Sequence, residues 1–345
     1  MAGYTLGGAL NRALRDALAA DPDVVVYGED VGRLGGVFRV TDGLGAEFGE
    51  DRCFDSPLAE SGIAGTAVGM AMYGRRPVVE MQFDAFAYPA FQQVVSHVAK
   101  MRNRTRGRVE LPLVIRIPYG GGIGAVEHHG DSSEAYYAHT PGLRVVTPAT
   151  ASDGYSLLRE AVESPDPVVF LEPKRRYWAR AELDLPVRTA PMDRAVVRRP
   201  GADLTVIAYG PTVDTALAAA EALAEEGREA EVVDLRSLSP LDDETVAASV
   251  RRTGRALVVH EAHEFGGFGA EIAARMTERC FHHLEAPVLR VCGLDVPYPP
   301  PHLEEFHLPS ADRILDAVDR LQWESSWVPG ASGPRPEASR TEVGA

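Results

Sequence analysis

Cysteine is scarce in this 345-residue sequence, which contains only Cys53, Cys280 and Cys292 and no Cys-x-x-Cys pair. An odd number of isolated cysteines predicts neither a disulfide framework nor a thiolate metal cluster, and it is typical of a reducing cytoplasm. The sequence also lacks a basic-then-apolar signal pattern at its start, and no apolar run reaches the roughly 18 residues of a membrane-spanning helix. These absences predict a cytoplasmic protein with no membrane segment.

Positive charge is in short supply as well, because 35 Lys and Arg residues stand against 50 Asp and Glu residues. The resulting net charge of −15 repels phosphate backbones and anionic lipids, so we expect neither nucleic acid nor a membrane as a partner. The composition, 45% hydrophobic and 25% charged, is that of a globular protein, and the length suffices for two domains.

Short apolar runs bounded by turn residues predict the strands of two α/β units. The runs cover 24–30, 76–83, 111–118, 143–149 and 167–173 in the first unit, and 204–210, 229–236, 255–262 and 288–295 in the second. Helical patterns lie between them, at 10–18, 56–71, 88–101, 212–226, 241–252 and 269–279. Continuous apolar strands that alternate with helices are typical of parallel or mixed sheets covered on both faces.

We therefore expect an α/β protein with two domains, one at 1–185 and one at 201–324. The stretch 186–200 has poor periodicity and is interpreted as the linker. The stretch 325–345 combines Pro, Gly, Ser and charge with little apolar content, which predicts a disordered tail.

A lone carboxylate, Glu60, lies in a run that has no other charge before Arg75. Ser56 and Pro57 favour a helix start just before it. On helical spacing Glu60 shares a face with Ile63, Ala64, Ala67, Val68 and Ala71, and the opposite face carries Ser61, Gly62, Gly65, Thr66 and Gly69. Favourable interaction with the helix dipole would explain such a carboxylate in an ordinary helix. Here both faces suit close packing, so we expect a helix buried all round, in which Glu60 needs a partner or a proton.

Two further segments follow predicted strands, where open parallel sheets bind their ligands. The run 24–30 places Gly28, Glu29 and Asp30 at a strand end, where they fit either a polar loop or a ligand site. The glycine-rich stretch 117–124 leads to His128 and His129, whose imidazoles titrate near neutral pH and can transfer protons. A metal site formed by His128, His129, Asp131 and His139 is an alternative, although adjacent histidines rarely point at one ion.

The remaining motifs favour packing over ligand binding. Phe83, Phe86, Tyr88 and Phe91 follow a strand and suit a core or interface cluster, although one ring at the strand exit could stack on a flat heterocycle. The segment 260–276 looks superficially like a dinucleotide fingerprint, but it lacks the GxGxxG spacing and a suitable acid after a following strand. Its glycines are better suited to a tight turn and close helix packing.

Taken together, seven stretches resemble the beta subunit of the thiamine-diphosphate-dependent decarboxylase component of 2-oxo acid dehydrogenase complexes. They are "YGEDVG" (27–32), "DSPLAESGIAGTAVGMA" (55–71), "EMQFDAFAYPAFQQ" (80–93), "HHGDSSEAYYAHTPGLRVVTPA" (128–149), "DPVVFLEPK" (166–174), "HEAHEFGGFGAEIAA" (260–274) and "LEAPVLRVCGLDVPYP" (284–299). The resemblance implies a transketolase-like pyrimidine-binding domain followed by a transketolase-like C-terminal domain.

By this resemblance Glu60 is the acid that hydrogen-bonds the pyrimidine ring of thiamine diphosphate, and Phe86 is the aromatic residue that packs on that ring. Glu29 is a further candidate for cofactor binding. His129 corresponds to the catalytic histidine near the step that transfers the acyl group to lipoyl. The family often has Ser-Gln after this histidine, whereas Gly130 and Asp131 stand here and place a carboxylate nearby.

Half of the cofactor site is missing from this chain. Thiamine enzymes hold the diphosphate through Mg²⁺ with a Gly-Asp-Gly motif and later asparagines, whereas the only asparagines here are Asn11 and Asn103. The resemblance therefore implies that an alpha subunit holds the Mg²⁺ and the diphosphate in an α2β2 heterotetramer, which works with a lipoyl acyltransferase core. A structural potassium ion of some relatives would correspond to Leu113, Ala161, Ser164 and Asp166, partly through main-chain carbonyls.

The stretches "DPVVFLEPKRRYW" and "CFHHLEAPVLRVCGLDVPYP" look more like the branched-chain branch of this family than the pyruvate branch. We thus expect a lipoyl-acylating 2-oxo acid dehydrogenase that is active only with the alpha subunit and takes a branched-chain 2-oxo acid. The alternatives are the beta subunit of a pyruvate or acetoin dehydrogenase, a fragment of a transketolase or deoxyxylulose-phosphate synthase, and a non-catalytic assembly subunit.

Overall fold

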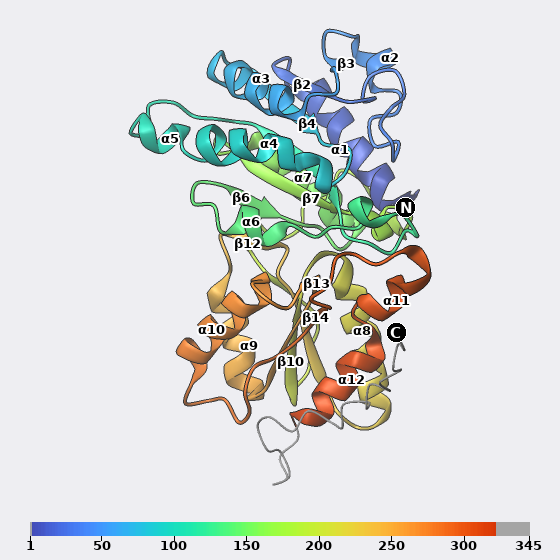
Figure 1. Cartoon of the computed structure of the whole chain (residues 1–345), viewed down its shortest axis with the longest axis vertical. Coiled ribbons are helices and arrows are strands. Elements are labelled where there is room, and N and C mark those ends of the chain that lie inside the picture. Colours follow the sequence, from blue (N-terminus) through green and yellow to red (C-terminus); the bar gives the residue numbers. More distant parts are fainter. Residues whose placement is uncertain (1, 322–345) are drawn as a thin grey trace, which may run out of the picture.

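The computed structural model describes residues 2–321, so the predicted tail at 325–345 lies outside the described residues. Two α/β domains are stacked along the long axis of the molecule, with the first half of the chain above the second (Figure 1). One domain contains a seven-stranded sheet and the other a five-stranded sheet, both with parallel and antiparallel neighbours. The predicted α/β class with two sheets is confirmed.

The sheet of the first domain has the strand order β12-β6-β7-β5-β4-β2-β3. Its strands are β2 (Val24–Gly28), β3 (Cys53–Asp55), β4 (Arg76–Glu80), β5 (Val114–Tyr119), β6 (Arg144–Val146), β7 (Val168–Pro173) and β12 (Ser237–Ser239). All neighbours run parallel except β12, which pairs antiparallel with β6. Because β12 comes after the start of the second domain, that domain supplies the last strand of the first sheet (Figure 1).

Helices cover both faces of this sheet, which explains why its strands read as continuous apolar runs. One face packs against α1 (Leu6–Ala20) and α7 (Ala151–Glu163), and the other against α3 (Glu60–Met72) and α4 (Tyr88–Gln93). In β7, Val168 and Phe170 belong to the core cluster of α1 and α7, while Val169 and Leu171 belong to the cluster of α3 and α4. All four side chains are fully buried.

Shorter elements complete the first domain. They are α2 (Leu44–Phe48), α5 (Met101–Arg104), α6 (Glu134–Ala138) and a separate antiparallel pair of β1 (Ala2–Thr5) with β8 (Arg180–Leu183). The helix predicted at 88–101 is interrupted, because α4 passes into a π-helical turn at Val94–Val98 before α5 begins.

The sheet of the second domain has the order β14-β13-β10-β11-β9. Its strands are β9 (Val196–Arg199), β10 (Leu204–Ala208), β11 (Ala230–Asp234), β13 (Ala256–His263) and β14 (Leu289–Gly293), and its helices are α8 (Val213–Glu225), α9 (Asp243–Thr253), α10 (Phe268–Cys280), α11 (Glu304–His307) and α12 (Ala311–Arg320). Residues 196–199, which the sequence places in the linker, thus form an edge strand antiparallel to β11. The strand was not predicted because it contains two arginines and two valines that are only partly buried, so it does not form a continuous apolar run.

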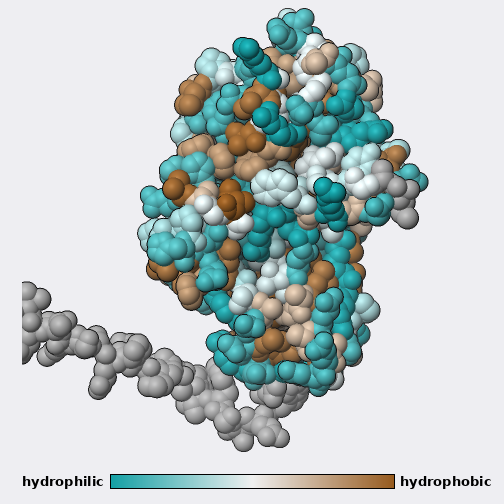
Figure 2. Space-filling view, turned by 90° about the vertical axis from the view of Figure 1, so that its right-hand side faces the viewer, coloured by the Kyte–Doolittle hydropathy of each residue, from teal (hydrophilic) through white to brown (hydrophobic). Residues whose placement is uncertain are grey.

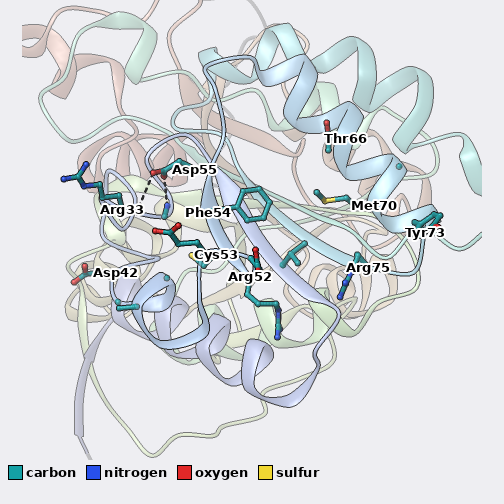
Figure 3. Close-up of a pocket in the computed structure, with 18 residues that line it drawn as sticks. Arg33, Asp42, Arg52, Cys53, Phe54, Asp55, Thr66, Met70, Tyr73 and Arg75 are labelled. Carbon is teal, nitrogen blue, oxygen red and sulfur yellow. Dashed lines mark hydrogen bonds between the residues drawn. The ribbon is translucent and has the colours of Figure 1, made fainter.

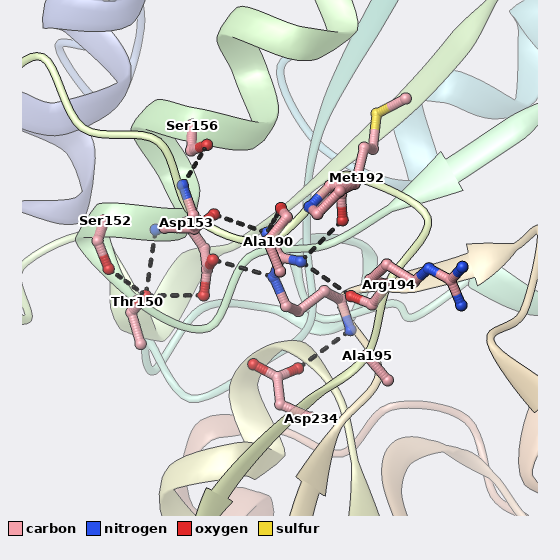
Figure 4. Close-up of polar contacts among 12 residues, drawn as sticks. Thr150, Ser152, Asp153, Ser156, Ala190, Met192, Arg194, Ala195 and Asp234 are labelled. Carbon is pink, nitrogen blue, oxygen red and sulfur yellow. Dashed lines mark hydrogen bonds and ion pairs between the residues drawn. The ribbon is translucent and has the colours of Figure 1, made fainter. Parts of the chain in front are cut away.

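Arg236, which follows β11, binds linker residues 189–194 and also Asp153 of the first domain. Its guanidinium is fully buried and uses all five of its N–H donors. Nε donates to Asp153 Oδ1 of α7 (2.9 Å). The other four donors go to the linker, namely to Thr189 Oγ1 (2.8 Å) and to the main-chain oxygens of Ala190 (2.9 Å), Pro191 (3.0 Å) and Arg194 (2.8 Å). Figure 4 shows the linker at Ala190, Arg194 and Ala195 beside Asp153 and Asp234, with the side chain of Arg194 turned away from both acids. The linker is therefore fixed by buried polar contacts.

The face of the molecule in Figure 2 is mostly hydrophilic, with its apolar side chains in small separate groups. This matches a composition that contains 50 acidic residues. Among residues 2–321, no helix combines the length and the apolar character needed to cross a membrane.

Candidate active site

Four strands of the first sheet lead into the segments that carry the predicted site residues. Glu29 follows β2 directly, Glu60 follows β3, Phe86 follows β4 and His129 follows β5. β3, β2, β4 and β5 are parallel neighbours, so these segments all leave the sheet at one edge, where open α/β sheets bind ligands.

The acidic part of the site contains Glu29 and Glu60, which are 7% and 9% exposed. Burial, followed by the negative charges of Glu60 and Asp30, raises the pKa of Glu29. Glu29 Oε1 is buried and has no hydrogen-bond partner among the described residues. Two buried carboxylates that repel one another favour a shared proton or a ligand that donates hydrogen bonds.

The helix that carries Glu60 begins later than the sequence predicts. Ser56 and Pro57 lie in a loop, α3 begins at Glu60, and the preceding Ala59 provides no side-chain cap. The cause lies in the sheet, because the Ser56 N–H donates to Gly28 O (2.8 Å) and keeps the chain extended beyond β3. Glu60 therefore stands in the first turn of α3, close to the end of β2.

The expectation that α3 is buried all round is wrong for the single chain. Its predicted apolar face, Ile63, Ala64, Ala67, Val68 and Ala71, is buried as expected. The opposite face is open, because Ser61, Gly62, Thr66 and Gly69 are exposed. Leu58 before the helix and Tyr73 after it are 80% and 94% exposed. Small and apolar residues left open on a helix are typical of a surface that a partner covers.

A groove of about 1680 Å³ runs between this face and the edge strand β3 (Figure 3). Phe54, Thr66, Met70 and Tyr73 line it together with Arg52. None of the four predicted site residues lines this groove. It is separate from the acidic pair, and it adds to the open surface beside α3.

The second part of the site is a cluster of aromatic rings around His129. The His129 ring lies edge-on to Phe83 and to Phe86, with centroid distances of 4.3 Å and 5.4 Å, and its centroid is 4.3 Å from that of His128. Burial, followed by the nearby His128 and Lys174, lowers the pKa of His129. His129 Nδ1 is buried without a partner among the described residues, so it is free to exchange a hydrogen bond with a ligand.

The structure brings the predicted residues together in two groups, Glu29 with Glu60 and Phe86 with His129. A hydrogen bond links the two segments, because Ser61 Oγ, next to Glu60, donates to Pro89 O (2.6 Å), three residues after Phe86.

The alternative sites find little support in the described residues. No group of three His, Cys, Asp or Glu side chains in residues 2–321 could hold a metal ion, which argues against the cluster of His128, His129, Asp131 and His139. A Cβ added to Gly267 or Gly269 would come within 2.7 Å or 2.5 Å of the His260 ring, so these glycines serve close packing, as predicted.

The potassium site stays a prediction. Leu113 O accepts from Val168 N (3.0 Å), Ala161 O accepts from Ser164 N (3.3 Å), and Ser164 Oγ donates to Asp166 O (2.9 Å). The Asp166 carboxylate pairs with Arg102 and lies 3.9 Å from Arg144 Nε. An ion at this place would have to share these main-chain oxygens with the hydrogen bonds that they already accept.

Sequence reasoning missed Lys174, which is fully buried at the end of β7. Its Nζ lies 5.9 Å from the centroid of Phe83, on which His129 also packs, and burial lowers the Lys174 pKa to about 8 despite nearby Asp84 and Glu261. It also missed Tyr298, Glu261 and Glu304 of the second domain, which contact the glycine stretch before His129. Of these four residues, only Lys174 gave a local signal in the sequence, because it is a charged residue directly after the apolar run of β7.

Comparison with known proteins identifies both domains. Residues 2–178 match the model of the transketolase pyrimidine-binding domain, and residues 193–314 match that of the transketolase C-terminal domain. A solved structure titled split gene transketolase, inactive beta4 tetramer, shares the fold with a TM-score of 0.76 at 26% identity, and the match covers 93% of this chain and 98% of that chain.

Curated relatives match over nearly the whole chain. The 3-methyl-2-oxobutanoate dehydrogenase subunit beta of Mycobacterium tuberculosis is 57% identical over 92% of this chain and 91% of its own length. The pyruvate dehydrogenase E1 component subunit beta of Leifsonia xyli is 55% identical over 90% of this chain and 93% of its own. The 2-oxoisovalerate dehydrogenase subunit beta of Pseudomonas aeruginosa is 46% identical over 91% and 93%. The chain therefore belongs to the family of 2-oxo acid dehydrogenase beta subunits, built from transketolase pyrimidine-binding and C-terminal domains.

Proposed function

We propose that this chain, together with an alpha subunit, decarboxylates a branched-chain 2-oxo acid on thiamine diphosphate and transfers the acyl group to lipoyl on an acyltransferase core. The observation that carries this proposal is the buried pair of Glu29 and Glu60 at the strand ends of a pyrimidine-binding domain. The 57% identical relative, named for 3-methyl-2-oxobutanoate, supports the branched-chain substrate.

The residues at the strand ends fit the pyrimidine half of this cofactor. Four buried polar atoms have no hydrogen-bond partner within the described part of the chain: Glu29 Oε1, Ser56 Oγ, His129 Nδ1 and Ser132 Oγ. The ring of Phe86 lies beside His129. A flat heterocycle with ring nitrogens and an amino group would supply the missing hydrogen bonds and a surface for the aromatic ring. When bound, thiamine diphosphate supplies the carbon nucleophile and the electron sink for loss of carbon dioxide.

Glu60 holds a proton at a ring nitrogen of the pyrimidine, and its burial favours a hydrogen bond to the ring over one to water. Glu29 stands beside it, and burial together with the negative charges of Glu60 and Asp30 raises the pKa of Glu29. Phe86 packs on the ring and excludes water from it.

His129 acts at the acyl-transfer step by donating a proton to the lipoyl dithiolane. Its lowered pKa makes the imidazolium, once the ring has taken up a proton, a readier donor than that of an ordinary histidine. The rings of Phe83 and Phe86 fix the orientation of the imidazole.

The diphosphate and Mg²⁺ are assigned to the alpha subunit, with an α2β2 heterotetramer as the working assembly. The chain has only two asparagines, Asn11, which donates to Val40 O and Asp42 O, and Asn103 in α5, and neither belongs to a Gly-Asp-Gly motif. The open face of α3 beside Glu60 offers a surface for the partner. We expect the isolated chain to bind thiamine diphosphate with Mg²⁺ only weakly, because half of the ligand has no donors here. Isothermal titration checks this, and micromolar binding by the chain alone would contradict the division of the site.

The substrate preference can be measured with the co-expressed alpha and beta subunits. We expect kcat/KM for 2-oxoisovalerate to exceed that for pyruvate by about 10-fold or more, because each added methyl or methylene in a fitting pocket contributes roughly 1–3 kcal/mol. A panel of pyruvate, 2-oxobutyrate and branched 2-oxo acids tests this expectation. A preference for pyruvate would favour the second candidate, a pyruvate dehydrogenase beta subunit, which the 55% identical relative supports.

A further inference from the structure

The glycine-rich loop that leads to His129 is held from outside its own domain. It leaves β5 at Tyr119 and runs through Gly120, Gly122 and Gly124, all with positive φ (78°, 81° and 66°). Glycine adopts this left-handed conformation without strain, and alternating backbone conformations of this kind can turn successive N–H groups toward one anion. The loop thus presents the N–H groups of Gly122 and Gly124 toward one side.

Glu304 of α11 accepts these donors. Gly122 N donates to Glu304 Oε1 (2.7 Å) and Gly124 N donates to Glu304 Oε2 (3.1 Å), so one carboxylate bridges the loop. Hydrogen bonds to an ionised carboxylate are about twice as strong as neutral ones. The contact joins residues that are 182 and 180 positions apart in the sequence.

Tyr298 reinforces this contact from the same side. Its hydroxyl donates to Glu304 Oε1 (2.5 Å) and accepts from Gly122 N (3.3 Å). The ring lies against both ends of the loop, because an added Cβ would come within 1.6 Å of Tyr298 at Gly121 and within 2.3 Å at Gly130. Gly130 directly follows His129, so Tyr298 touches the backbone that carries the imidazole.

The first domain anchors the other end of the loop. Ser133 donates to Asp84 through its main-chain N (2.7 Å) and its Oγ (2.5 Å), and Asp131 O accepts from Gly120 N (2.8 Å). Without Glu304, the N–H of Gly124 would have no acceptor among residues 2–321, and Gly122 would keep only its longer contact with Tyr298. Gly120 and Gly121 would still donate to Asp131 O and to Glu261.

We propose that Tyr298 and Glu304 form a clasp through which the second domain positions the loop of His129 for acyl transfer. Glu304 and Tyr298 are positioning residues, since they act through the loop. The inference rests on the role proposed for His129, and it assigns the second domain a part in the reaction itself.

The test compares Glu304→Ala, Glu304→Gln and Tyr298→Phe with the control Glu305→Ala in the co-expressed assembly. Glu305 is the exposed neighbour of Glu304 in the same short helix. Hydrogen exchange reports on the loop directly, and we expect the amides of residues 121–130 to exchange about 10-fold faster or more in Glu304→Ala. The Gln variant, which keeps one acceptor oxygen, should lie between Ala and the parent protein, and Glu305→Ala should match the parent.

Activity is measured in two ways on the same variants. With the lipoyl acyltransferase the rate should fall about 10-fold in Glu304→Ala, whereas decarboxylation with an artificial electron acceptor, which bypasses lipoyl, should fall much less. A variant that is simply less stable would lose both rates together.

The outcomes separate the clasp from the role of His129. Unchanged loop exchange in Glu304→Ala, or a rise in either rate, would overturn the clasp, because Glu304 would then be dispensable or would block the site. Faster loop exchange with both rates unchanged would support the clasp as a contact and refute the role proposed for His129.

Discussion

Replacing Glu60 with Gln in the assembled enzyme is expected to reduce decarboxylation by about 100- to 10,000-fold, the usual contribution of one positioned acid or base. Glutamine has the shape of glutamate, but its amide cannot exchange a proton with a pyrimidine nitrogen. The fold should tolerate the change, because Glu60 makes no ion pair with the residues that the structure describes. Steady-state turnover, with far-UV circular dichroism and thermal unfolding, measures both effects.

Two comparisons make this result specific. Glu221→Gln, on the exposed side of α8, removes the same charge from the second domain and should leave turnover unchanged. Glu29→Gln removes the other buried carboxylate and should cost less than Glu60→Gln. Turnover near the parent level in Glu60→Gln would eliminate its proposed role, and a larger loss in Glu29→Gln would move the proton to Glu29.

Replacing Arg236 with Met is expected to lower the free energy of unfolding by about 3–5 kcal/mol, the usual cost of removing one partner from a buried ion pair. Methionine fills much of the same volume, so packing contributes little to the loss. Four oxygens of the linker, three from the main chain and one from the Thr189 side chain, lose the N–H groups that Arg236 donates. Asp153 keeps its ion pair with Arg198. Burial alone would raise the pKa of Asp153, and Arg198 and Arg236 together lower it.

Chemical unfolding followed by circular dichroism measures this loss. The matched control is Arg194→Met in the same linker, because the Arg194 side chain is 57% exposed and lies 3.5 Å from Asp242. Only the arginine of this pair is exposed, since Asp242 is buried, but Asp242 keeps its hydrogen bonds to Thr245 and to Ala195 N in the control. A pair with a solvent-exposed cation contributes about 1 kcal/mol or less, so the control should unfold almost like the parent protein. If the two changes lowered the free energy of unfolding equally, the buried network of Arg236 would contribute no more stability than the partly exposed pair of Arg194.

The elements with local periodicity could be predicted from the sequence. The runs at 76–83 and 204–210 contain β4 and β10, and the helical pattern at 212–226 corresponds to α8 at Val213–Glu225. The strands appear as continuous apolar runs because helices cover both faces of each sheet, and the helix shows the 3.6-residue period of its buried face. The elements without such a pattern, β9 and β12, were missed because each lies at a sheet edge and depends on its neighbour.

The site could be predicted only in part, for a related reason. Glu60 became a candidate because a charge in an apolar helix is a local anomaly, and its role stays a prediction. The start of α3 was misplaced because Gly28, more than 25 residues earlier, holds Ser56 in extended backbone. The open face of α3 could not be predicted, because the same small residues suit either a core or a subunit contact. Glu304 gave no local signal at all.

The position of strand β12 limits where the protein can be truncated. It belongs to the second domain by position but completes the edge of the first sheet, so removing everything after the linker would leave β6 uncapped and able to pair with another molecule. Chimeras between relatives should therefore exchange both domains together, or carry Ser237–Ser239 with the first. A strand from one domain completes the sheet of the other, so the two domains are expected to fold and to be exchanged as one unit.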